Sequence, residues 1–190
     1  MYDPKKNLQY FKFDTSKIRF KDLIKQHVKN SIKCENLEEF NNYIPDDKMP
    51  KDILEGTAHT YGHDILYAID PIFNQAGIVP ALDIGFMGEY KKFVNFLREK
   101  IFKTSIVYQK KPSIRIHYPN YTSYGKFHRD SDYEHPKNEI NIWIPITKTI
   151  GTATMLIESE KYKEDYSPVE LDYGNFVIGI HILISFLGCS

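Results

Sequence analysis

The chain has few cysteines and no excess of charge of either sign, and both features exclude whole classes of protein. Its 190 residues include two cysteines, Cys34 and Cys189, which are too few for a disulfide framework and fit a reducing compartment. Lysine plus arginine and aspartate plus glutamate each number 25, so charge gives no reason to expect a nucleic acid or an anionic membrane as a partner. No apolar segment of a signal peptide follows the first residues, and the expected compartment is therefore the cytoplasm.

The chain also lacks the long apolar runs and the short motifs that identify several other classes. The apolar segment over residues 176–187 is far shorter than the roughly 20 residues that cross a bilayer, so we interpret it as buried strand and not as a membrane anchor. No nucleophile elbow, Walker loop or C-x-x-C pair occurs. Length and an aromatic content of 14% predict one folded domain over residues 1–190.

The order of the local patterns predicts the fold class. Apolar residues spaced by three and four predict amphipathic helices over about 17–33 and 86–102, and the second is expected to pack its stripe on a sheet. Asn36, followed three residues later by Glu39, predicts a short helix to about residue 43. Later patterns are short β-rich runs between turn residues: 105–108, 113–118, 139–147, 152–158, 169–173 and 175–184. The sequence therefore predicts an α+β domain, with a helical part over about 1–103 buttressing a β-sandwich over about 104–190.

His128 and Asp130 carry the most chemical information in the chain. Side chains two residues apart in an extended segment lie on the same face, so both of these can reach one ion. An imidazole and a carboxylate are two of the three ligands in the 2-His-1-carboxylate arrangement, which binds Fe(II) and leaves positions open for O₂ and substrate. The alternative interpretation is a turn aspartate beside a surface histidine.

Other histidines and acidic residues predict less. His59 and His63 would share one face of a helix, but the glutamate that a zinc protease needs after its first histidine is missing. The acidic run over residues 130–134 is followed by His135, where a calcium loop needs glycine. His135 is instead a candidate substrate contact in a loop.

Asn141 and Trp143 are candidate pocket residues. They share one face of an expected strand, opposite Ile140, Ile142 and Ile144. In a barrel-like sandwich one face of each strand lines the interior. If the face of Asn141 and Trp143 is the inner one, these two side chains contact substrate.

Around these residues the chain resembles the Fe(II)/2-oxoglutarate-dependent oxygenase superfamily, most closely its phytanoyl-CoA-hydroxylase-like and streptomycin-biosynthesis-type members. The resemblance runs from Pro112 to about Asn175. It rests on five segments in the family's order: 113–118, 127–130, 141–147, 153–159 and 173–178. The resemblance implies a double-stranded β-helix (jelly roll), Fe(II), 2-oxoglutarate as co-substrate, and hydroxylation or a related oxidation of a small molecule.

The same resemblance implies a third metal ligand and a cation for the co-substrate. The family places its second histidine on a late strand, and His181 is the only histidine after His135. Family members then carry an arginine that binds the far carboxylate of 2-oxoglutarate. No arginine follows Arg129 in this chain. Either the chain diverges or is cut short after Ile178, or another cation serves, namely Lys148 or Arg115.

Three functions therefore remain open from the sequence. The first is an active oxygenase that acts on a small molecule and uses O₂. The second is a catalytically inactive relative that serves as a β-sandwich binding or structural protein. The third is a cupin-like metal-binding protein that uses no 2-oxoglutarate.

Overall fold

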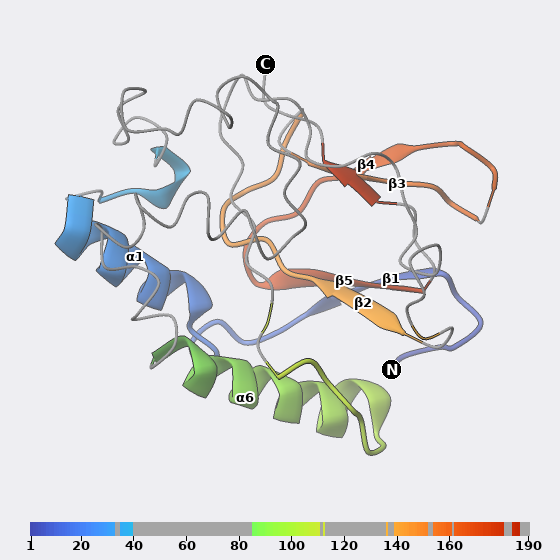
Figure 1. Cartoon of the computed structure of the whole chain (residues 1–190), viewed down its shortest axis with the longest axis horizontal. Coiled ribbons are helices and arrows are strands. Elements are labelled where there is room, and N and C mark those ends of the chain that lie inside the picture. Colours follow the sequence, from blue (N-terminus) through green and yellow to red (C-terminus); the bar gives the residue numbers. More distant parts are fainter. Residues whose placement is uncertain are drawn as a thin grey trace. The chain divides into compact units, whose positions relative to one another are not determined.

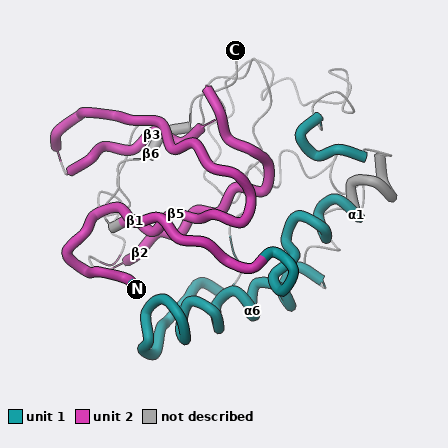
Figure 2. The backbone as a smooth tube through the Cα atoms, turned by 180° about the vertical axis from the view of Figure 1, so that it is seen from behind, with its two compact units in different colours: residues 1, 15–116 teal, residues 2–14, 117–190 magenta. Residues whose placement is uncertain are grey.

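A computed structural model describes most of the two ends of the chain and a helical segment between them (Figure 1). The described residues are 1–32, 35–39, 85–110, 112, 136, 139–151, 154–160, 162–180 and 184–186. The chain divides into two compact units, which Figure 2 shows in different colours. One unit comprises residues 1 and 15–116, and the other comprises residues 2–14 and 117–190. That all 190 residues form one domain stays a prediction.

The described part of the first unit is helical. Helix α1 spans Phe20–Ile32, and helix α6 spans Met87–Phe96. The π-helical turn η4, Leu97–Phe102, continues α6 directly. The periodicity of the sequence therefore predicted both helices to within three residues at each end, which is the usual uncertainty of helix boundaries.

A short helical turn over residues 37–39 begins at Asn36. The Asn36 Oδ1 atom accepts a hydrogen bond from the backbone N–H of Glu38 at 3.1 Å, and its Nδ2 donates to Glu39 Oε1 at 3.0 Å. Asn36 thus caps the turn as its sequence predicts. Residues 40–43, the rest of the expected helix, lie outside the described residues.

Most of the apolar stripe along α6 and η4 is buried, and Tyr90 in it is partly buried. No more than 7% of the surface of Phe86, Phe93, Leu97 or Ile101 is exposed. Phe20 of α1 is 2% exposed, and its ring centroid lies 5.0 Å from that of Phe86 and 5.8 Å from that of Phe93. Burying one such side chain stabilises a fold by roughly 1.5–3 kcal/mol, so this cluster holds α1 and α6 together. That the stripe also packs on the sheet stays a prediction.

Glu89 is a buried carboxylate that links the two helices. Its Oε2 atom accepts a hydrogen bond from the backbone N–H of Arg19 at 2.8 Å, where α1 begins and its first N–H groups lack partners within the helix. Its Oε1 atom pairs with Lys92 Nζ at 2.7 Å. Burial raises the pKa of Glu89, but the hydrogen bonds and positive charges of Lys92 and Arg19 outweigh it, and the net result is a lowered pKa.

Replacing Glu89 with alanine is expected to lower the free energy of unfolding by about 1–3 kcal/mol, because the Arg19 N–H loses its acceptor in a partly buried hydrogen bond. The lowered pKa also predicts a pH dependence. The stabilisation is present above the unfolded-state pKa, near 4.5, and is lost as the pH falls through the lower folded-state pKa. Lowering the pH from about 7 to about 3 should therefore destabilise the native chain more than it destabilises the Glu89→Gln variant. Thermal unfolding at each pH measures this difference. Equal pH dependence of the two proteins, with Glu99→Gln as the exposed control, would contradict this assignment.

The second unit contains two three-stranded antiparallel sheets. The first sheet comprises, in spatial order, β1 (Leu8–Lys12), β5 (Asn175–Ile180) and β2 (Ile140–Trp143). The second sheet comprises β4 (Ser167–Val169), β3 (Met155–Ile157) and β6 (Ile184–Phe186). The apolar segment over residues 176–187 therefore contains strand structure, as predicted, with Phe176 and Ile178 fully buried.

The sequence did not predict β1, and it predicted several other strands with the wrong limits. Strand β1 pairs with β5, whose residues lie more than 160 positions later in the chain, so no local pattern reveals it. The expected strand over 105–108 is not a strand in the structure, and that over 139–147 ends at Trp143, two residues before Pro145, which has no N–H to donate. The expected strand over 113–118 lies outside the described residues.

An apolar cluster joins the two sheets. Its buried members are Met155 and Ile157 of β3, Val169 of β4 and Val177 of β5, each no more than 3% exposed. Leu8, Trp143 and Leu171 are partly buried and pack against this cluster. Because the members come from both sheets, the inner faces of the sheets pack on each other.

The described part of the chain is therefore a mixed α and β structure with few helices and small antiparallel sheets. This agrees with the expected α+β class, while the complete jelly roll stays a prediction. None of the helices in the described ranges is both long and apolar enough to span a bilayer.

Candidate functional site

The residues expected to hold a metal lie outside the described part of the chain. They are His128, Asp130 and His181. Arg115 and His135, expected to contact co-substrate and substrate, also lie outside it. Among the residues that are described, no three His, Cys, Asp or Glu side chains are grouped so that they could hold a metal ion. The five assignments therefore stay predictions.

The register of the first sheet nevertheless relates two chain positions that flank the expected ligands. Ile140, the first residue of β2, pairs with Ile180, the last residue of β5. His181 follows Ile180 directly in the sequence, and Asp130 precedes Ile140 by ten residues. The chain thus enters β2 and leaves β5 at the same end of the sheet, which is the arrangement that a site built from these two segments requires.

The structure decides which face of β2 is turned toward the second sheet. Trp143 lies opposite Val177 and Asn141 lies opposite Gly179 in the antiparallel register, and directly opposed side chains lie on the same face. Val177 belongs to the cluster between the sheets, and Trp143 packs against that cluster. The face that carries Asn141 and Trp143 is therefore the inner one. Contact between these residues and a substrate stays a prediction.

Gly179 is a residue of the inner face that the sequence patterns did not indicate. It lies inside the central strand β5, where it is buried and stands opposite both Leu8 and Asn141. Glycine in a strand interior weakens the strand, and it often marks close approach of another group. Without a side chain at this position, the inner face leaves more room beside Asn141 than any other residue would. The sequence feature that could have indicated this position is the glycine itself, which interrupts the apolar segment over residues 176–187.

Lys148, a candidate for binding 2-oxoglutarate, lies in the segment after β2. Its side chain is 59% exposed, and its Nζ atom lies 4.0 Å from Oδ1 of Asp172, which is 70% exposed. Ion pairs between exposed groups contribute little to stability, so the pair with Asp172 is weak. The neighbouring Thr149 is buried, and its Oγ1 accepts from the backbone N–H of Leu171 at 2.9 Å. The backbone beside Lys148 is thus held in place.

A second buried hydroxyl reinforces this segment. Thr154 is 2% exposed, and its Oγ1 donates to the carbonyl oxygen of Val169 at 2.5 Å. The Thr149 Oγ1 lies 3.2 Å from the same carbonyl oxygen, which has two lone pairs and can accept both hydrogen bonds. These contacts tie the chain between β2 and β3 to the end of β4.

Comparison with known proteins gives a partial likeness. The chain is 32% identical over 74 residues to the streptomycin biosynthesis protein StrG of Streptomyces griseus. The matched residues are 39% of this chain and 34% of StrG, so the chain matches about a third of the length of that relative. No family model and no solved structure matches the chain. The sequence is therefore similar, over part of its length, to a protein of a biosynthetic pathway.

Proposed function

We propose that this chain is a biosynthetic enzyme of the Fe(II)/2-oxoglutarate-dependent oxygenase type that oxidises a small molecule. The observation that carries the proposal is the pair His128 and Asp130 ahead of β2, together with the partial likeness to a streptomycin biosynthesis protein. His128, Asp130 and His181 would hold the metal, and their two imidazoles and one carboxylate suit Fe(II). When bound, the metal would activate O₂ for oxidation of the substrate.

The architecture of the second unit supports this proposal. Two small antiparallel sheets pack face to face through an apolar cluster, as the sheets of a double-stranded β-helix do. Chain entry to β2 and chain exit from β5 lie at one end of the first sheet. The expected ligands from both segments would then converge at that end.

The inner face of β2 would position the substrate. Asn141 would offer an amide donor and acceptor, and Trp143 would offer an apolar wall that excludes water. His135 would contact the substrate from the loop that precedes β2. These side chains would hold the substrate so that its reacting bond has the orientation that the reaction requires.

Lys148 and Arg115 are the cations proposed to bind the far carboxylate of 2-oxoglutarate. Lys148 is the one of the two that lies in the described part of the chain, where its side chain is exposed and its backbone is held through Thr149. Arg115 would instead offer a bidentate guanidinium.

A second candidate function is a metal-binding or inactive relative that does not use 2-oxoglutarate. The observation that favours it is the sequence after Arg129, which contains no arginine. Arginine is the residue best suited to bind a carboxylate through two hydrogen bonds. In this alternative the packed sheets would serve binding alone.

Titration of the purified chain with Fe(II), with and without 2-oxoglutarate, separates the candidates. An oxygenase is expected to bind Fe(II) and to bind 2-oxoglutarate more tightly when Fe(II) is present. A cupin-like protein would bind Fe(II) with the same affinity whether or not 2-oxoglutarate is added. An inactive relative without a metal site would bind neither, and that result would refute the proposed function.

A further inference from the structure

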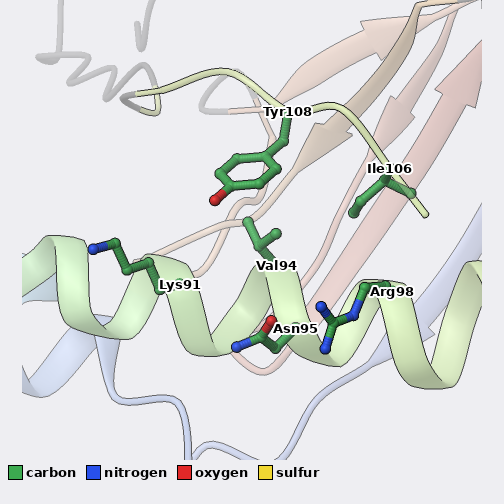
Figure 3. A pocket seen from close by; sticks show the side chains of 6 residues that line it. All are labelled: Lys91, Val94, Asn95, Arg98, Ile106 and Tyr108. Carbon is green, nitrogen blue, oxygen red and sulfur yellow. The ribbon is translucent and has the colours of Figure 1, made fainter.

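A small cavity in the first unit lies between α6–η4 and the segment that follows them. Its volume is about 220 Å³. It is lined by Lys91, Val94, Asn95, Arg98, Ile106 and Tyr108, which Figure 3 shows from close by. Cavities that hold drug-sized ligands usually measure roughly 300–1,000 Å³, so this one suits a smaller molecule.

One wall of the cavity is polar and positively charged. Lys91, Asn95 and Arg98 are spaced by four and three residues, which places them along one face of the helix. Arg98 Nη2 lies 3.0 Å from Oε1 of Glu99, but both side chains are more than half exposed. Such a pair is worth about 0–1 kcal/mol, so a ligand carboxylate can replace it. In the described part of the chain, the Lys91 ammonium and the Asn95 amide make no hydrogen bond.

The opposite wall is formed by the Ile106 side chain and the Tyr108 ring, and it is held in place. Tyr108 and Ile106 lie in the segment after Lys103, whose left-handed backbone (φ 56°) ends η4. The Tyr90 hydroxyl donates to the backbone oxygen of Gln109 at 2.8 Å, and the rings of Tyr90 and Tyr108 meet edge to face with centroids 6.0 Å apart. These contacts fix Tyr108 over the helix near Val94 (Figure 3).

We propose that this cavity is a binding site for a small aromatic carboxylate. The carboxylate would pair with Arg98 and Lys91 and accept a hydrogen bond from the Asn95 amide. The ring would lie against Tyr108, Val94 and Ile106, where aromatic contact adds to apolar burial. The site lies wholly within residues 15–116 and its existence does not depend on the proposed oxygenase function.

Benzoate is the probe, and the ¹⁵N-labelled full chain is titrated while amide NMR signals are followed. Binding is expected to shift the amide signals of residues 91–98. Lys91→Gln/Arg98→Gln should weaken benzoate binding roughly tenfold or more, because charge-assisted hydrogen bonds are lost. Lys100→Gln, an exposed cation on η4 that does not line the cavity, should leave the affinity unchanged.

Two further probes test the two walls separately: benzyl alcohol, which has the ring but no charge, and acetate, which has the charge but no ring. Benzyl alcohol keeps the ring without the charge and should bind roughly tenfold more weakly than benzoate. Tyr108→Ala should weaken benzoate binding several-fold and leave acetate binding unchanged.

Four results would overturn the proposal. The first is no shift of signals 91–98 at about 20 mM benzoate, a concentration that saturates even a weak site. The second is equal benzoate affinity in the double variant and the native chain. The third is equal affinity for benzyl alcohol. The fourth is inorganic phosphate binding at these residues as tightly as benzoate, since the apolar wall would then contribute nothing. Preserved signal dispersion in each variant shows that it is folded.

Discussion

A Phe176→Ala variant is expected to lose about 3–5 kcal/mol of unfolding free energy, as buried aromatic truncations do. Phe176 is 0% exposed and lies in β5, which pairs with β1 on one side and β2 on the other. Its ring stacks on Phe11 with centroids 5.5 Å apart, and its centroid lies 6.2 Å from that of Phe13. The substitution therefore leaves a cavity where β1 meets the central strand. Thermal unfolding should show a midpoint lowered by about 6–20 °C.

Two control variants separate this effect from a general sensitivity of the chain. Phe176→Leu keeps most of the apolar volume and should cost clearly less than alanine. Ile150→Ala changes a side chain that is 53% exposed, so its cost should stay near 0.5 kcal/mol. If Phe176→Ala were no more destabilising than Ile150→Ala, that result would contradict the packing of β1 on β5 described above.

The second large effect is expected at the proposed metal ligands. His128→Ala should weaken Fe(II) binding by at least about 100-fold, because even loss of a group behind a ligand costs about 10- to 100-fold. His181→Ala should have the same effect if His181 is the third ligand. Fe(II) titration of each variant under anaerobic conditions measures both, and far-ultraviolet circular dichroism confirms that the fold is kept.

The pair His59 and His63 provides the matched control for these substitutions. They are the other histidines whose spacing would suit a shared metal. Their double alanine variant should bind Fe(II) like the native chain. Loss of binding in this variant, with His128→Ala unaffected, would move the metal site to His59 and His63. Native-like binding by His181→Ala alone would show that another group provides the third ligand.

Local patterns predicted the helices well, because a helix is determined largely by residues three or four positions apart in the sequence. The stripe that includes Phe93 and Leu97 repeats with the period of a helix, and the structure buries it. Asn36 was predictable as a cap for the same reason, since its partners Glu38 and Glu39 lie within three residues.

The strands were less predictable because their partners are distant in sequence. Strand β1 depends on a pairing between Leu8 and Gly179 that no window of neighbouring residues contains. The inner face of β2 was undecided from alternation alone, because Trp143 and Ile142 are both apolar. The cluster around Val177 decides it, and that cluster exists only after both sheets have formed.

The candidate sites likewise combine features that depend on neighbouring residues with features that depend on tertiary packing. The spacing of His128 and Asp130 indicates a shared ion without any structure, because it follows from the geometry of an extended chain. The cavity beside Arg98 could not be predicted, since its apolar wall is supplied by Tyr108, which returns over the helix after Lys103. Tertiary packing therefore contributes the part of each site that the sequence does not show.

The most direct test of the proposed function is O₂ uptake by the purified chain loaded with Fe(II). We expect uptake to depend on 2-oxoglutarate, to fall to background in His128→Ala, and to be unchanged in the His59→Ala/His63→Ala control. Uptake that is absent at saturating 2-oxoglutarate, or that is identical in His128→Ala and the native chain, would contradict the assignment of this chain as an Fe(II)/2-oxoglutarate-dependent oxygenase.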